Sequence, residues 1–93
     1  MAIQIRRSAS SSTAEVVFTI PDQHHFGVVS VVGTFNDWKP GVDVFVLRPD
    51  GTRVAEVVVD DDEIHFRYLG SGGVWFDDPD AEQDERGCVI RLT

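Results

Sequence analysis

Apolar and polar residues alternate with a period of two along most of this chain, and this pattern constrains the fold more than any other feature. The clearest examples are EVVFTI (15–20), RVAEVVV (53–59) and IHFRYL (64–69). A strand places successive side chains on opposite faces, so this period is typical of strands with one buried face. Helical spacing is absent, and the sequence therefore predicts an all-β protein.

Turn-forming residues separate these stretches at short intervals. PDGT (49–52) is the strongest signal, because Pro followed by Asp-Gly favours a tight hairpin, and DDDE (60–63) and GSGG (70–73) supply two more. Further short strands are expected in GVVSVVGTF (27–35), VFVLR (44–48), VWFD (74–77) and CVIRL (88–92). About seven short antiparallel strands in a chain of 93 residues predict an immunoglobulin-like β-sandwich.

The alternation also predicts which side chains face the core. The expected inward residues are Val16, Phe18, Ile20, Phe26, Val29, Val31, Phe45, Leu47, Ala55, Val57, Val59, Ile64, Phe66 and Tyr68. The expected outward residues are Ser30, Glu56, His65, Arg67 and Leu69.

The length of the chain allows one domain. SASSST (8–13) is a polar low-complexity stretch, so residues 1–13 are expected to be a flexible N-terminal lead-in and residues 14–93 the sandwich. No apolar run follows the first arginines as in a secretory signal, and none approaches the length of a membrane span. A single cysteine, Cys88, excludes an internal disulfide. We therefore expect a cytoplasmic protein.

The formal net charge is −8 and its distribution is uneven. Ten acidic residues lie between Asp60 and Glu85, where Arg67 is the only arginine or lysine. Such a field repels phosphates, which argues against nucleic acid and against membrane surfaces as partners. The simplest interpretation of the acidic stretches is that they form solvated loops.

The sequence offers little for metal binding or catalysis. DDDE (60–63) lacks the alternating spacing and the glycine of a calcium loop, so it reads as a charged hairpin tip. No nucleophile elbow or phosphate-binding glycine loop accompanies the histidines His24, His25 and His65, and nothing local pairs Cys88 with one of them. We expect no metal, no cofactor and no enzymatic activity.

The two tryptophans fit the core pattern less well than the other aromatic residues. Trp38 lies in the turn GTFNDWKPG (33–41), where Phe35 is expected to face inward. Trp75 precedes Phe76, and neighbours in a strand face opposite sides, so a buried Phe76 leaves Trp75 outside. Either each tryptophan caps an edge of the core, or the two together form a surface on which pyranose rings stack.

Three motifs in order resemble carbohydrate-binding module family 48: VSVVGTFNDWKP (29–40), HFRYL (65–69) and GGVWFDDPDA (72–81). That family includes the early-set domain ahead of isoamylase and branching enzymes and the glycogen-binding domain of the AMP-activated kinase β subunit. The resemblance runs from about Val16 to Leu92. It implies an immunoglobulin-like early-set sandwich that binds α-1,4-glucan, such as glycogen or starch, without catalysis.

The resemblance also implies roles for individual residues. Trp38 and Trp75 correspond to the two rings that stack on sugar, and Arg67 to the basic residue that hydrogen-bonds sugar hydroxyls. The chain departs from the family where a longer loop supplies an apolar finger and an asparagine. Here the loop 80–86 is short and acidic, and Gly87 stands where the asparagine is expected, so binding should be weak.

Two classes of partner follow from these features. The first is an α-glucan polysaccharide or oligosaccharide bound by Trp38, Arg67 and Trp75. The alternative is a protein–protein interaction module of the same fold with a degenerate sugar site, docked onto a glycogen-metabolising enzyme or another protein. Exposed tryptophan and arginine are common anchors of protein interfaces, so the same residues would serve either partner.

Overall fold

The computed structural model of the chain describes residues 2–7, 13–22 and 27–92, and within them nine strands form. They are β1 (Ala2–Arg7), β2 (Ala14–Pro21), β3 (Val29–Gly33), β4 (Val46–Leu47), β5 (Thr52–Val59), β6 (Glu63–Gly70), β7 (Val74–Phe76), β8 (Glu82–Asp84) and β9 (Gly87–Arg91). The described residues contain no helix long and apolar enough to cross a membrane. The sequence prediction for Phe26, and the histidines at 24 and 25, fall outside the described residues.

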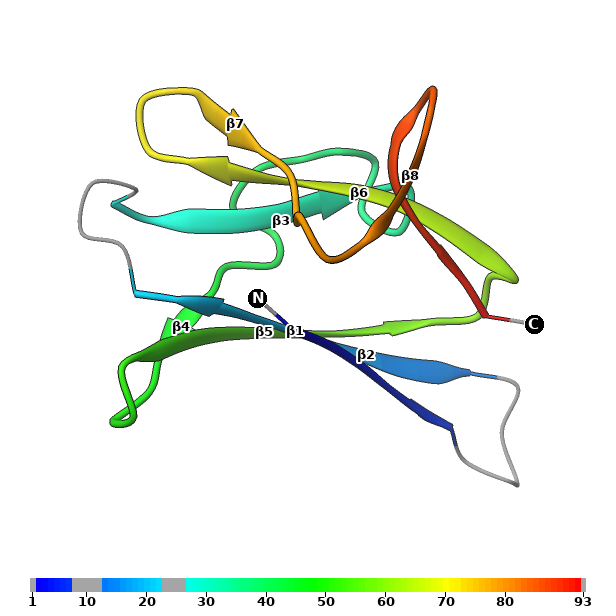
Figure 1. Cartoon of the computed structure of the whole chain (residues 1–93), viewed down its shortest axis with the longest axis horizontal. Coiled ribbons are helices and arrows are strands. Elements are labelled where there is room, and N and C mark those ends of the chain that lie inside the picture. Colours follow the sequence, from blue (N-terminus) through cyan, green and yellow to red (C-terminus); the bar gives the residue numbers. More distant parts are fainter. Residues whose placement is uncertain (1, 8–12, 23–26, 93) are drawn as a thin grey trace.

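The strands form two antiparallel sheets that lie in separate layers (Figure 1). The first sheet has the order β1-β2-β5-β4. The second has the order β3-β6-β9-β8, and β7 also pairs with β6. The predicted immunoglobulin-like β-sandwich is thus confirmed, although the described residues hold two strands more than the seven expected.

The core lies between the two sheets and is built largely from the residues that the alternation predicts, with Ala14, Cys88, Ile90 and Leu92 in addition. Its fully buried rings are Phe18 from the first sheet, and Phe66 and Tyr68 from the second. The Phe18 ring centre lies 4.9 Å from that of Phe66 and 6.2 Å from that of Tyr68. Full burial of such a side chain contributes about 2 kcal/mol, so these contacts hold the layers together.

The N-terminal residues correct one prediction. Instead of a flexible lead-in, Ala2–Arg7 forms β1, which pairs antiparallel with β2 and places Ile3 opposite Phe18. Ile3 packs against the core, while most of β1 is exposed. Pairing with β1 supplies hydrogen-bond partners for the backbone N–H and C=O groups on the edge of β2, which is a physical reason for Ala2–Arg7 to form a strand. Residues 8–12 of the expected lead-in lie outside the described residues.

The segment before β5 passes from one sheet to the other. The Asp43 carbonyl accepts a hydrogen bond from Val31 at 2.9 Å and the Phe45 N–H donates one to Val29 at 2.8 Å, so this part pairs with β3. The chain then enters β4 and pairs with β5 in the first sheet. This change of sheet breaks the alternation: Phe45 is buried as predicted, but Leu47 is 59% exposed, contrary to the prediction.

Candidate ligand-binding surface

The outer face of the second sheet carries two of the three predicted site residues in contact. Val32 lies opposite Arg67 in the β3–β6 pair, and Leu69 lies opposite Trp75 in the β6–β7 pair. Residues two apart share a face of a strand, so Arg67 and Trp75 are diagonal neighbours on the outer face.

Arg67 is held between an aromatic ring and a carboxylate. Its guanidinium carbon lies 5.2 Å from the centre of the Trp75 ring, within the range of a cation–π interaction. Its Nε donates a hydrogen bond to Asp77 Oδ1 at 2.9 Å. Trp75 is 45% exposed, whereas Phe76 packs against the core, so the predicted orientations of these neighbours are confirmed.

The turn that carries Trp38 is anchored by Asn36. The Asn36 Oδ1 accepts a hydrogen bond from the Gly33 N–H at 3.0 Å. Its Nδ2 donates to the Val31 carbonyl at 3.0 Å and to Asp43 Oδ2 at 2.9 Å. One side chain therefore ties the start of the turn to β3 and to the segment that returns from it.

The same turn contains backbone strain at its tip. Asp37 and Trp38 have φ angles of 56° and 59°, in the left-handed region that residues other than glycine rarely adopt. The Trp38 N–H donates to the Gly33 carbonyl at 3.0 Å, which holds this conformation. Phe35 packs against the core with its ring stacked on Phe18, as predicted, and Trp38 remains 36% exposed.

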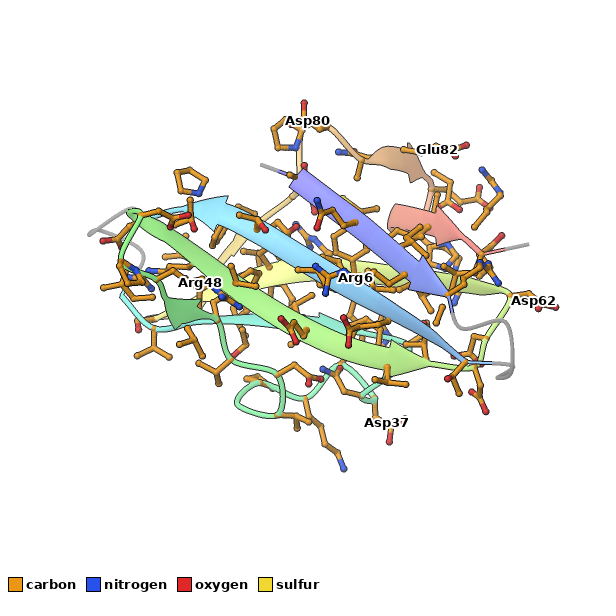
Figure 2. The ribbon with its side chains drawn as sticks, turned by 90° about the horizontal axis from the view of Figure 1, so that it is seen from below. Arg6, Asp37, Arg48, Asp62, Asp80 and Glu82 are labelled. Carbon is orange, nitrogen blue, oxygen red and sulfur yellow. The ribbon has the colours of Figure 1, made fainter. Side chains whose placement is uncertain are left out.

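The Trp38 turn lies on the outer side of the second sheet. Ser30 points outward from β3, and its Oγ accepts a hydrogen bond from the Gly41 N–H at 3.1 Å. This cover explains why Ser30 is buried although it faces outward as predicted. Figure 2 shows Asp37 at one edge of the sandwich and Asp80 at the opposite edge, so the Trp38 turn and the chain after β7 flank the sheet. The Trp38 turn thus follows β3 of the same sheet, and the contacts found among the described residues join Arg67 to Trp75 and Asp77 but not to Trp38.

A buried carboxyl group fixes the chain after β7. Asp78 is fully buried, and its Oδ2 accepts a hydrogen bond from the Tyr68 hydroxyl at 2.8 Å. Its Oδ1 accepts one from the Asp80 N–H at 2.9 Å. Burial, with the neighbouring Asp78 carboxyl, raises the pKa of Tyr68 far above its ordinary value. This bond ties the segment that follows Trp75 to β6.

A histidine–aspartate pair ties β8 to β6. His65 faces outward as predicted but is only 3% exposed, and its Nε2 lies 2.8 Å from Asp84 Oδ2. Its Nδ1 lies 3.9 Å from Glu63 Oε1. The hydrogen bond with His65 lowers the pKa of Asp84. The pair therefore fixes β8 against β6 through a buried imidazole ring.

The acidic residues are therefore more than solvated loops. Asp77, Asp78 and Asp84 each bind a specific side chain of β6, namely Arg67, Tyr68 and His65. These partners were not predicted from the sequence. The only hint in the sequence was that many acidic residues flank a strand with three polar side chains, His65, Arg67 and Tyr68. Hydrogen bonds between distant segments leave no periodic pattern that could have identified the pairs.

No group of three or more His, Cys, Asp or Glu side chains in the described part of the chain is placed to hold a metal ion. The acids at 60–63 are exposed where β5 turns into β6, as the hairpin prediction requires. Cys88 is buried in the core, and burial raises the pKa of its thiol.

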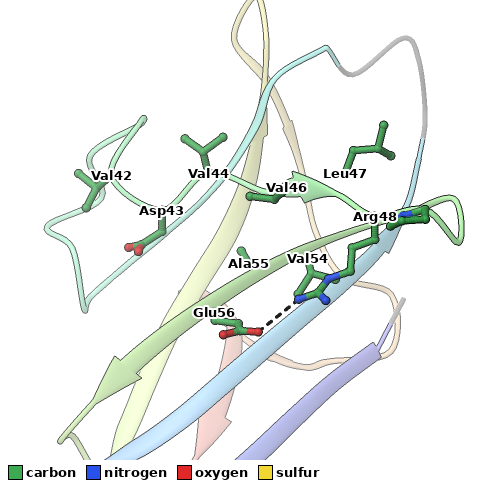
Figure 3. A pocket seen from close by; sticks show the side chains of 10 residues that line it. Val42, Asp43, Val44, Val46, Leu47, Arg48, Val54, Ala55 and Glu56 are labelled. Atoms are coloured by element: carbon green, nitrogen blue, oxygen red, sulfur yellow. Dashed lines mark hydrogen bonds and ion pairs between the residues drawn. The ribbon is translucent and has the colours of Figure 1, made fainter.

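A hollow of ≈ 590 Å³ lies elsewhere, between β5 and the segment that changes sheets (Figure 3). It is lined by Val42, Asp43, Val44, Val46, Leu47, Arg48, Pro49, Val54, Ala55 and Glu56. Arg48 and Glu56 form an ion pair of 3.4 Å across it. The tryptophans and Arg67 do not line this hollow.

Comparison of the chain with protein-family models, with curated proteins and with solved structures finds no significant match. The resemblance described above therefore rests on its sequence motifs, and the fold rests on the structure.

Proposed function

We propose that this protein is a non-catalytic module that binds α-1,4-linked glucan, such as glycogen or starch, by aromatic stacking. The observation that carries the proposal is the packing of Arg67 on the exposed Trp75 ring, and the exposed Trp38 at the tip of the strained turn after β3 adds to it. Strain of this kind costs about 1–3 kcal/mol per residue and is concentrated at functional sites.

The chemistry of the three side chains suits a sugar polymer. The apolar C–H face of a pyranose ring can lie on an indole ring, and the guanidinium donors can bind hydroxyls at the rim of the sugar. Gly87 presents no side chain beside the Arg67 stem, and residues 82–86 are exposed. Few neighbouring side chains are therefore available to enclose a ligand bound by Trp38, Arg67 and Trp75, which supports weak binding.

The proposal places the protein in the cytoplasm, with the polysaccharide itself or a glycogen-metabolising enzyme as its partner. A single cysteine left as a free, buried thiol supports this placement, because reducing compartments keep thiols unpaired.

Retention on immobilised glycogen or amylopectin tests the proposal. The unchanged protein should be retained, and Trp38→Ala should weaken retention by roughly tenfold or more, about 1.4 kcal/mol. Val58→Ala is a matched control, because Val58 is exposed on the first sheet. A protein that flows through both matrices would refute glucan binding, and equal loss in the control would refute the role of Trp38.

A protein partner is the second candidate, and one feature favours it. β4 is an edge strand of the first sheet, and Val42, Val44, Val46 and Leu47 leave an apolar surface exposed along it. Exposed apolar edges bind extended segments of other proteins as an added strand. In that case Val46→Asp should abolish the association while Trp38→Ala leaves it intact. If Trp38→Ala instead abolishes the association, the partner binds at Trp38 and not at the β4 edge.

A further inference from the structure

Asp77 contacts Arg67 from the position directly after β7, the strand that carries Trp75. Trp75 and Asp77 are both partly exposed, whereas Phe76 packs against the core and Asp78 is fully buried. The Arg67 Nε–H bonds to Asp77 Oδ1 at 2.9 Å, and the guanidinium carbon lies 5.2 Å from the centre of the Trp75 ring. Two side chains of one segment thus hold the guanidinium from two directions.

We propose that Asp77 is a positioning residue that fixes Arg67 against Trp75 before a ligand arrives. This inference rests on the proposed glucan binding, for which Arg67 supplies the hydrogen-bond donors. A guanidinium has five N–H donors, and Asp77 engages the one on Nε, so the terminal nitrogens keep donors for hydroxyl groups. An arginine that is already ordered loses less side-chain entropy on binding than a free one.

The surrounding residues make Asp77 the specific partner of this arginine. The neighbouring acids have other partners: Asp78 binds Tyr68, Asp84 binds His65, and Glu82 binds Arg91. On the other side, Gly87 lies beside the Arg67 stem, where a Cβ atom would be 3.6 Å from Arg67 Cγ. The stem is thus backed by main chain, and its carboxylate contact comes from Asp77.

The first experiment measures the position of Arg67 without sugar. The chain has two tryptophans, so a Trp38→Phe background leaves Trp75 as the only source of indole emission. Asp77→Ala in this background should shift the emission and raise its quenching by acrylamide, because the guanidinium leaves the ring. Asp77→Asn keeps an acceptor oxygen and should stay close to the parent. Glu85→Gln removes one exposed charge from a nearby turn and should change nothing. Unchanged emission in Asp77→Ala would overturn the inference.

The second experiment keeps Trp38 and measures the dissociation constant for maltoheptaose by calorimetry. Asp77→Ala should bind roughly 3- to 10-fold more weakly, with Asp77→Asn between it and the parent and Glu85→Gln equal to the parent. Equal or tighter binding by Asp77→Ala would overturn the inference, because Arg67 held by Asp77 would then block the Trp75 ring from the sugar. A parent that binds no maltoheptaose refutes the proposed function alone, and the emission experiment still decides whether Asp77 holds Arg67.

Discussion

The Arg67 guanidinium lies over the Trp75 ring at 5.2 Å, although the residue directly opposite Trp75 is Leu69. The contact is therefore diagonal across the β6–β7 pair, which long side chains can span. A cation–π contact at an exposed site contributes about 0.5–1 kcal/mol. By itself it does not offset the rotamer entropy of an arginine side chain, about 2 kcal/mol, so the hydrogen bond to Asp77 is needed to order Arg67.

Asn36 should be essential to the turn that presents Trp38. Asn36→Ala removes three hydrogen bonds to Gly33, Val31 and Asp43, so it should lower the free energy of unfolding by roughly 2 kcal/mol and weaken glucan retention. Urea denaturation measures the first effect. Asn36→Asp keeps the acceptor for the Gly33 N–H but sets a carboxylate oxygen against Asp43 and the Val31 carbonyl, so it should lose at least as much stability as Asn36→Ala. A small loss in both variants would show that the turn is held by other contacts.

Two glycines of the same turn should respond differently to alanine. A Cβ atom on Gly33 would lie 2.3 Å from the His65 carbonyl oxygen, so Gly33→Ala must push β3 from β6 and should cost more than about 2 kcal/mol. Gly41 has open space but a φ of 84°, so Gly41→Ala should cost about 1 kcal/mol from backbone strain alone. Thermal unfolding of both variants checks the order, and equal costs would contradict the close approach at Gly33.

Tyr68 should make the fold sensitive to alkali. Burial raises its folded pKa above the ordinary 10.0, so its contribution to stability is present below pH 10.0 and is lost as pH rises above that value. The loss should approach about 1.4 kcal/mol per pH unit. Since Tyr68 is the only tyrosine, phenolate absorbance should appear together with global unfolding. Phenolate formation in the folded protein near pH 10.0 would contradict the buried hydroxyl.

Asp84 should contribute stability that disappears in acid. Its hydrogen bond with His65 lowers the folded pKa below 3.8, so the contribution is present above pH 3.8 and is lost as pH falls through the folded value. Asp84→Asn should therefore be less stable than the parent near neutrality, and the two stability curves should converge in acid. A difference that stays constant down to acidic pH would count against the pairing.

The alternation of apolar residues was sufficient to predict much of the fold. It located Phe18, Phe66 and Tyr68 in the core because each of these strands has one face buried between the two sheets. It failed at Leu47, where the chain changes sheets and the period of two is interrupted. It could not reveal β8, because Glu82–Asp84 has no apolar residue and is a strand only through its pairing with β9.

The candidate site was predicted only in part for a related reason. The strand neighbours of Trp75 gave its outward orientation, and alternation gave that of Arg67. The positive φ of Trp38 and the bond between Arg67 and Asp77 depend on tertiary contacts that no local pattern encodes. The sequence therefore indicated which rings are exposed, and the structure added what holds them.

The most direct test of the account is a titration of the ¹⁵N-labelled protein with maltoheptaose, followed by the indole N–H signals of Trp38 and Trp75 and the Nε–H signal of Arg67. All three signals should shift together along one saturating curve, while the backbone signals of exposed β4 stay in place. Saturating sugar that leaves the three signals unmoved, or that moves only the β4 edge, would contradict it.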